Sequence, residues 1–176
     1  GSSVLPLEAF QSVRFCEGVA RDAASKQLAS PELVVQLFFR TAEGGRENVL
    51  VRGVEAVALQ VHDEVAIVEG RMFQPSSGEA IVGSGVAGRY VGAQVGDTLE
   101  FGRGHWKVVG RFDSNGSSFE SEVWVDVREL AAGFERKVTT MLQLEPGGLR
   151  EPARAARGAV TVRAVDPATE ADAVIA

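Results

Sequence analysis

Residues 105–126 read HWKVVGRFDSNGSSFESEVWVD, and this stretch decides how the rest of the chain is interpreted. Its two ends, His105 to Phe112 and Glu122 to Asp126, are rich in valine and aromatic residues, which favours β-strands. Between them, Ser114 to Ser118 consists of serine, asparagine and glycine, a composition typical of a polar loop. The stretch therefore predicts two strands joined by a loop.

The residues before this stretch continue the same pattern of short apolar runs that end at glycines. Strands are predicted at Val65 to Val68, Ala80 to Val82 and Asp97 to Phe101, and a short helix at Ser84 to Tyr90. Residues 61–134 are therefore interpreted as an inserted, mainly antiparallel β subdomain. The glycines expected to end or bend its strands and the strand before it are Gly53, Gly70, Gly83 and Gly110.

The flanking segments, residues 1–60 and 135–176, mix helices with strands and predict an α/β frame around this insertion. Helices are expected in the frame at Leu7 to Cys16 and Leu149 to Arg157, and another at Val127 to Phe134, at the end of the insertion. The expected strands of the frame are Glu32 to Arg40, Asn48 to Val54, Val138 to Leu144 and Ala159 to Val165. The fold class predicted for the whole chain is α+β.

Composition excludes several functional classes. The 176 residues are 45% hydrophobic, enough for a folded core, and carry a net charge of −6, which disfavours nucleic-acid binding. The one cysteine, Cys16, excludes an internal disulfide and zinc sites of the CxxC type. No apolar run in the chain approaches the length of a membrane span.

Catalytic patterns are absent or incomplete. His62 and His105 are the two histidines, and no serine lies in a G-x-S-x-G turn that could provide a nucleophile. The His62-Asp63 pair is interpreted as a solvated turn and His105 as a surface or half-buried side chain. Glu120 and Glu122 could form a carboxylate pair on one strand face, although exposed strand carboxylates are the simpler interpretation.

Two ligand-binding patterns are also present in part. Residues 83–88 read GSGVAG and match G-x-G-x-x-G, but the glycines that follow leave no room for the helix of a dinucleotide site. Residues 113–117 resemble a calcium loop, yet Trp124 stands where the bidentate glutamate should be. Neither an enzyme activity nor a cofactor or metal is therefore expected in this domain.

An ordered series of short motifs gives the chain a resemblance to a known family. The series begins with EGRMF (Glu69–Phe73), EAIVG (Glu79–Gly83) and VGDTL (Val95–Leu99). It continues with WKVVGRF (Trp106–Phe112) and ESEVWVD (Glu120–Asp126). In order and spacing this series resembles the periplasmic core domain of MacB/FtsX-type ABC transporter permeases.

The resemblance implies a Porter-like α/β subdomain, residues 1–60 and 135–176, and an inserted Sabre-like β subdomain, residues 61–134. It implies an extracytoplasmic (periplasmic) domain of a dimeric inner-membrane permease that works with a cytoplasmic ATPase subunit or domain. Such a domain is non-catalytic, and it relays conformational change or contacts cargo or a partner. A periplasmic adaptor, or a lipoprotein, peptide or amphiphile as cargo, would be that partner. The alternative function is a stand-alone extracytoplasmic module that binds peptide, lipid or carbohydrate.

The loop that joins the two most family-like strands is the candidate contact site. Its aromatic residue, Phe119, follows small polar residues and could anchor a partner or an amphiphilic cargo. The alternative is that Phe119 folds back and covers the hydrophobic core. The candidate contact residues are Ser114, Asn115, Ser117, Ser118 and Phe119.

Overall fold

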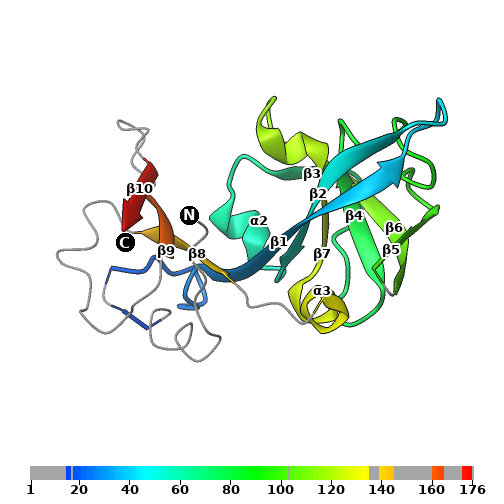
Figure 1. Ribbon diagram of the computed structural model, residues 1–176. Coiled ribbons are helices and arrows are strands. Elements are labelled where there is room, and N and C mark those ends of the chain that lie inside the picture. The colour runs from blue at the N-terminus through cyan, green and yellow to red at the C-terminus, as the bar shows by residue number, and fades with distance from the viewer. Residues whose placement is uncertain are drawn as a thin grey trace. The chain divides into compact units, whose positions relative to one another are not determined.

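The structure is a computed structural model that describes residues 15–16, 18–102 and 104–134, and the backbone of strands at 139–144, 160–164 and 172–175. The chain divides into two compact units, whose helices and strands are shown in Figure 1. The larger unit is Leu33–Arg136, and the smaller unit combines Gly1–Glu32 with Lys137–Ala176.

The predicted boundary at residues 60 and 61 falls inside the larger unit. Residues 33–60 group with the central block because β2 (Arg46–Val54) pairs in parallel with β7 (Glu122–Asp126). The compact units therefore differ from the predicted subdomains, and the division into a Porter-like frame and a Sabre-like insertion stays a prediction.

The smaller unit contains strands from both ends of the chain. Its strand order is β10 (Asp172–Ile175), β9 (Val160–Ala164), β8 (Thr139–Leu144) and the first four residues of β1 (Ala29–Arg40). The strands predicted near residues 138–144 and 159–165 are confirmed, whereas β10 was not predicted. The helices predicted at Leu7 to Cys16 and Leu149 to Arg157 lie outside the described residues, apart from Phe15 and Cys16.

The larger unit is built on a mixed sheet in the order β1-β2-β7-β4-β6-β3, with β5 also paired to β6. Its remaining strands are β3 (Ala66–Gly70), β4 (Glu79–Gly83), β5 (Thr98–Phe101) and β6 (Gly104–Asp113). Among β3 to β7, only the β4–β6 pair is parallel, and the β3–β6, β4–β7 and β5–β6 pairs are antiparallel. The predicted α+β class and the mainly antiparallel central block are thus confirmed.

Helices are few and short in the larger unit. α3 (Val127–Phe134) begins after Asp126, whose Oδ1 accepts hydrogen bonds from the N–H groups of Arg128 and Glu129, at 2.7 and 3.1 Å. α2 (Ala58–Val61) was not predicted, and a 3₁₀ turn, η1, spans Ser118–Ser121. Within the described residues, no helix has both the length and the apolar character that a bilayer crossing requires.

The short helix predicted at Ser84 to Tyr90 is wrong. The segment forms successive turns, in which the N–H groups of Val86 and Ala87 both donate to Gly83 O. Gly88 then takes a φ of +81°, which does not continue a right-handed helix. The G-x-G-x-x-G match therefore opens no helix. Gly85 N–H instead donates to Glu120 O at 2.9 Å, which fastens these turns to η1.

Three of the four glycines predicted to end or bend strands do so, whereas Gly53 lies inside the paired part of β2, opposite Leu33 on β1 and Val125 on β7. Gly70 and Gly83 are the last residues of β3 and β4, and Gly53 is the penultimate residue of β2. Gly110 follows the point in β6 where the register with β4 shifts by one residue. The shift leaves Val109 without a partner on β4, and an extra residue of this kind bends a strand locally.

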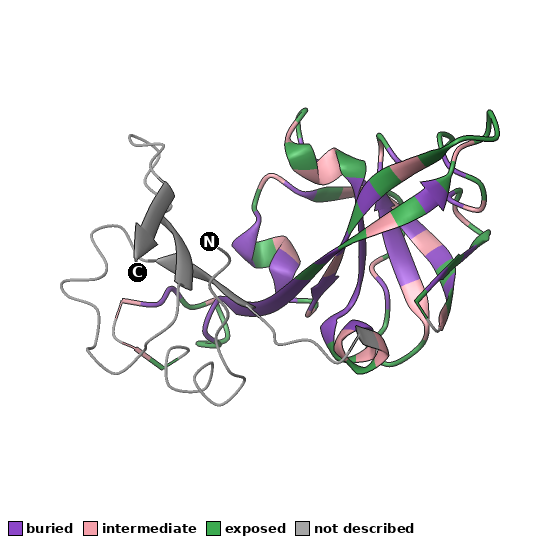
Figure 2. Cartoon of the chain, in the orientation of Figure 1, coloured by how far each residue is buried: buried purple, intermediate pink, exposed green. Residues whose placement is uncertain are grey.

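The core of the larger unit has two aromatic parts, and Figure 2 shows the buried residues on its strands. One contains Trp124, Phe112 and Ile81 with Val54 and neighbouring apolar side chains. In the other, Phe101 stacks on Trp106 at 5.1 Å and on Phe39 at 5.5 Å between ring centroids. The loop after β6 lies over the first of these parts.

Candidate functional site

The candidate contact loop, residues 114–119, is a tight turn after β6 that continues into the first two residues of η1. Asn115 and Gly116 have φ values of +53° and +80°, so two consecutive residues are in the left-handed region. Asparagine and glycine are among the residues that best tolerate this conformation. The asparagine–glycine pair therefore gives the loop a defined backbone.

The carboxyl groups of Glu120 and Asp113 hold this loop. Glu120 Oε1 accepts hydrogen bonds from the N–H groups of Ser114 (3.1 Å) and Gly116 (2.6 Å), and Asp113 Oδ1 accepts from Ser114 N–H at 2.7 Å. A hydrogen bond with the Glu120 carboxyl group, and then the Ser114 N–H, keep the pKa of Asp113 below its usual range. The hydroxyl groups of Ser114 and Ser117 are 2.7 Å apart and hydrogen-bonded. The hydroxyl groups of Ser114 and Ser117 are therefore engaged in a hydrogen bond inside the loop and do not face a partner.

Phe119 packs on the core beneath the loop. Its ring is half-buried and makes edge-to-face contacts with His62 and Trp124, at centroid distances of 4.7 and 5.6 Å. The guanidinium carbon of Arg52 lies 5.1 Å from the ring centroid, a cation–π arrangement. These contacts support the core-covering alternative for Phe119. The exposed residues of the loop are Asn115, Gly116 and Ser118.

A buried ion pair lies next to Phe119. The Nε and NH2 groups of Arg52 donate to the two carboxylate oxygens of Glu122 at 2.7 and 2.8 Å, and Trp124 Nε1 donates to the same carboxylate at 2.9 Å. Glu122 is only 2% exposed, so it is not the exposed strand carboxylate expected from the sequence. The alternative of a Glu120–Glu122 carboxylate pair on one strand face does not hold either, since Glu120 lies in η1 and accepts hydrogen bonds from the loop.

The two histidines occupy different environments. His62 is 1% exposed and lies against Phe119 and Trp124, so the predicted solvated turn is wrong at this residue. His62 is the C-cap residue of α2, and its backbone N–H donates to Ala58 O at 2.8 Å. His105 is exposed on β6, as expected, with its Nδ1 3.4 Å from Glu100. Within the described residues no group of three or more histidine, cysteine, aspartate or glutamate side chains is arranged to hold a metal ion.

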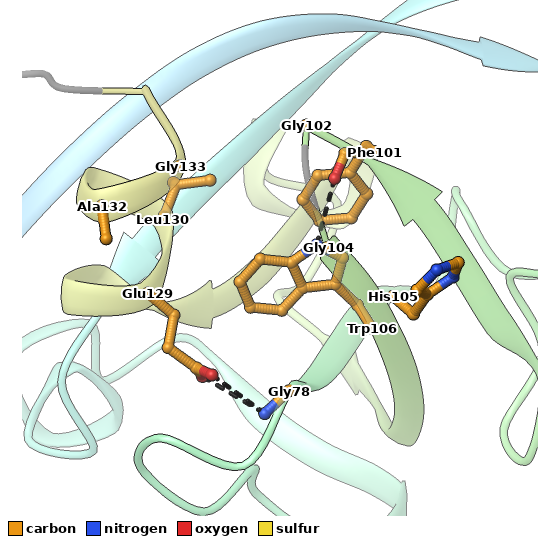
Figure 3. A pocket seen from close by; sticks show the side chains of 10 residues that line it. All are labelled: Gly78, Phe101, Gly102, Gly104, His105, Trp106, Glu129, Leu130, Ala132 and Gly133. Atoms are coloured by element: carbon orange, nitrogen blue, oxygen red, sulfur yellow. Dashed lines mark hydrogen bonds between the residues drawn. The ribbon is translucent and has the colours of Figure 1, made fainter.

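An open pocket of about 300 Å³ lies elsewhere in the larger unit, between α3 and the β5–β6 hairpin (Figure 3). Trp106 and Phe101 form its aromatic wall, and Trp106 Nε1 donates to Phe101 O at 3.4 Å. Opposite them, the Glu129 carboxylate accepts from Gly78 N–H at 3.1 and 3.3 Å. His105 is the one other titratable side chain among the lining residues, so this pocket offers a largely apolar surface.

The motif residues that carry the family resemblance hold strands together. Arg71 of EGRMF donates two hydrogen bonds to the carboxylate of Glu79 in EAIVG. Phe73 is buried with Trp124 in the first core. Gly70 stands opposite Gly110 of WKVVGRF in the β3–β6 pair. The series therefore specifies the packing of the central block.

Comparisons with known proteins agree with this arrangement. The family described as MacB-like periplasmic core domain matches the chain over residues 8–174. No curated protein matches the sequence significantly. Among solved structures, the extracellular domain of the noncanonic ABC-type transporter YknZ from Gram-positive bacteria is similar, with a TM-score of 0.60 and 18% identity. The alignment covers 81% of this chain and 74% of that one.

A second similar structure is the periplasmic region of MacB from Actinobacillus actinomycetemcomitans. It has a TM-score of 0.59 and 8% identity, and the alignment covers 84% of this chain and 68% of that one. At these identities the two structures show a common fold. The match to the family over nearly the whole chain shows the relationship itself. The chain belongs to the MacB-like periplasmic core domain family, the extracytoplasmic domains of MacB-type ABC transporter permeases.

Proposed function

We propose that this domain is a non-catalytic relay, which transmits conformational change between the membrane part of a permease and a partner or cargo outside the membrane. The observation that carries the proposal is that the family motifs are used for strand packing. Arg71–Glu79 and Gly70–Gly110 join β3, β4 and β6 into one unit. A well-packed block of this kind moves as a rigid body, as a relay requires.

In this proposal the energy comes from a cytoplasmic ATPase subunit or domain, reached through the full-length, dimeric permease. The domain itself needs no cofactor. A periplasmic adaptor, or a lipoprotein, peptide or amphiphile, would be what it contacts on the outside. Of the candidate contact residues, Asn115 and Ser118 are exposed, and Ser114, Ser117 and Phe119 support them from below. The exposed pair is therefore the proposed contact point of the loop.

Substitution in the full-length permease tests this contact. Ser118→Trp places a bulky side chain on the exposed side of the loop, and Gln94→Trp does the same at an exposed position away from it. We expect Ser118→Trp to reduce transport and the stimulation of ATP hydrolysis while the melting temperature stays unchanged. Equal effects of the two substitutions on transport would contradict a contact role for the loop.

The pocket beside Trp106 favours a second candidate function, a module that binds a small apolar ligand. Its volume of about 300 Å³ lies at the lower end of ligand sites, and its walls are mainly apolar. Dodecyl maltoside is a suitable probe, with Trp124→Phe introduced so that the fluorescence reports on Trp106 alone. A saturable change that Gly133→Leu abolishes would support binding in this pocket, and a linear response would exclude it.

A further inference from the structure

The outer edge of β1 has no strand beside it in the larger unit. β2 pairs with Leu33–Arg40 on one side, and β8 pairs only with Ala29–Glu32. Among the described residues, no strand pairs with residues 33–39 on the side away from β2. The edge is closed only at its far end, where Val91 N–H donates to Arg40 O and Ala42 N–H donates to Arg89 O.

The register shows which backbone groups face this edge. Thr41 N–H donates to Gly45 O within the hairpin, so Arg40 C=O, in the same peptide unit, points the opposite way, toward Val91. In an antiparallel pair this direction alternates with each residue. The N–H and C=O groups of Val34, Gln36 and Phe38 therefore point away from β2. Unpaired groups of this kind are a template for another strand.

The side chains along this edge are unusually apolar for an exposed surface. Phe38 is 70% exposed, Val34 is 40% exposed, and Leu50 on β2 is 39% exposed on the same face. Leu50 stands opposite Gln36, so Val34 and Phe38 are its two diagonal neighbours. Val91, at the closed end of the edge, is 63% exposed. Most of the exposed large hydrophobic side chains among the described residues therefore lie around this one strand edge.

The charges at the far end of the edge lack partners. Arg40 and Arg46 face each other across the hairpin, and neither has a carboxylate partner among the described residues. The other five described arginines of the larger unit are all paired with glutamates, in the pairs Arg52–Glu122, Arg71–Glu79, Arg89–Glu47, Arg111–Glu69 and Arg128–Glu55. Two like charges directly opposite each other destabilise a hairpin unless an anion lies beside them. Guanidinium groups bind carboxylates in particular.

We propose that the β1 edge from Leu33 to Phe39 binds an extended segment of a partner protein by strand addition. The segment would carry apolar side chains at alternate positions, next to Val34 and Phe38, and a carboxylate at the end beside Arg40. Main-chain hydrogen bonds supply the affinity in this mode of recognition, and the alternating side chains supply the specificity. This inference does not depend on the relay function proposed above.

A second copy of this chain fits the edge less well. Antiparallel pairing of two β1 strands about Gln36 would bring Arg40 opposite Glu32 of the other copy. Glu32 is 1% exposed and lies where β8 already pairs, so it cannot meet an incoming arginine. The acidic group must therefore come from a different polypeptide.

A defined peptide tests the proposal. The probe is a soluble heptapeptide that alternates valine and threonine and carries one glutamate at its N-terminal end, with a second version that carries the glutamate at the C-terminal end. The two versions correspond to the two possible directions of the added strand. At least one of them is expected to bind the 176-residue chain saturably in fluorescence anisotropy. Replacing the glutamate with glutamine, or making Arg40→Gln with Arg46→Gln, should weaken binding about tenfold, the equivalent of one lost charge-assisted hydrogen bond.

Two controls separate strand addition from adhesion to an apolar surface. N-methylation of alternate peptide amides removes the edge hydrogen bonds without altering the protein, and should abolish binding. Gln36→Pro removes an N–H that faces the free edge, so it should abolish binding while the chain stays folded by circular dichroism. Binding that survives both changes, or binding of phosphatidylglycerol vesicles in place of both peptides, would overturn the proposal. So would a dimer, seen by analytical ultracentrifugation, that Gln36→Pro dissociates.

Discussion

Gly70 on β3 and Gly110 on β6 stand opposite each other at a point where the two strands leave no space for side chains. A Cβ atom at Gly110 would collide with the carbonyl oxygen of Arg71, and one at Gly70 with the carbonyl oxygen of Val109. Gly70 also has a φ of +71°, which side-chain-bearing residues rarely adopt. The close approach brings Arg71 to its place beside Glu79, so the glycine pair and the ion pair form one structural element.

Gly110→Ala should destabilise the chain strongly. The obstacle is a backbone atom, so relief requires movement of β3 or β6 and not of a flexible side chain. Overpacking of this kind costs about 1–3 kcal/mol, and we expect a value at the upper end of that range in urea unfolding. Gly133→Ala is the matched control, because a Cβ there has open space in a helix. It should stabilise the chain by about 0.5–1 kcal/mol, and equal effects of the two substitutions would contradict the close-approach account.

The Arg71–Glu79 pair predicts a specific pH dependence. The hydrogen bond from Arg71 lowers the pKa of Glu79 from 4.5 to about 2 in the folded chain. A lowered folded-state pKa stabilises the chain above pH 4.5, and this contribution is lost as the pH falls toward 2. Glu79→Gln should therefore be less stable than the parent at pH 6, by a small amount because Arg71 is half exposed.

The difference between Glu79→Gln and the parent should shrink as urea unfolding is repeated at lower pH down to 2.5. Adding Arg71→Met to Glu79→Gln should change little at either pH, since the pair is already broken. A stability difference that stays constant from pH 6 to 2.5 would show that the ion pair is not its cause.

The Arg52–Glu122 pair should be far more costly to break. Arg52→Met leaves the Glu122 carboxylate buried without its bidentate partner, and such a change costs about 3–5 kcal/mol. The double variant Arg52→Met with Glu122→Gln should be more stable than Arg52→Met alone, because a neutral amide still accepts from Trp124 Nε1. Chemical unfolding of the two variants measures this difference. A double variant less stable than the single one would show that the loss of charge is not the dominant effect.

The strands were predictable where the signal is local. The runs at residues 32–40, 48–54 and 122–126 are valine-rich, and each lies within or coincides with an observed strand. The helix predicted at residues 84–90 was wrong because the turn bonds to Gly83 and the left-handed Gly88 replace helical hydrogen bonding. The family resemblance came from motif order and spacing, which the match over residues 8–174 confirms.

The burial of Glu122 and His62 was not predictable, because it depends on distant partners. Arg52 and Glu122 are 70 positions apart and meet only because β2 and β7 pair in parallel. His62 is followed by an aspartate, as an exposed turn residue would be, and only the packing of Phe119 and Trp124 reveals its burial. His62 and the Arg52–Glu122 pair both lie next to Phe119 of the candidate contact loop. The sequence therefore predicted the position of the loop, but not the buried side chains on which it packs.

Phe119→Ala decides between the two roles of this residue. Because the ring is half-buried against His62, Trp124 and Arg52, its removal should cost about 2 kcal/mol, less than for a fully buried phenylalanine. In a chain of this length that cost corresponds to a fall in melting temperature of about 4–8 °C. Ser118→Ala, at an exposed position in the same loop, should leave the melting temperature unchanged. If Phe119→Ala instead melts like the parent and weakens transport in the full-length permease, the ring contacts a partner and does not cover the core.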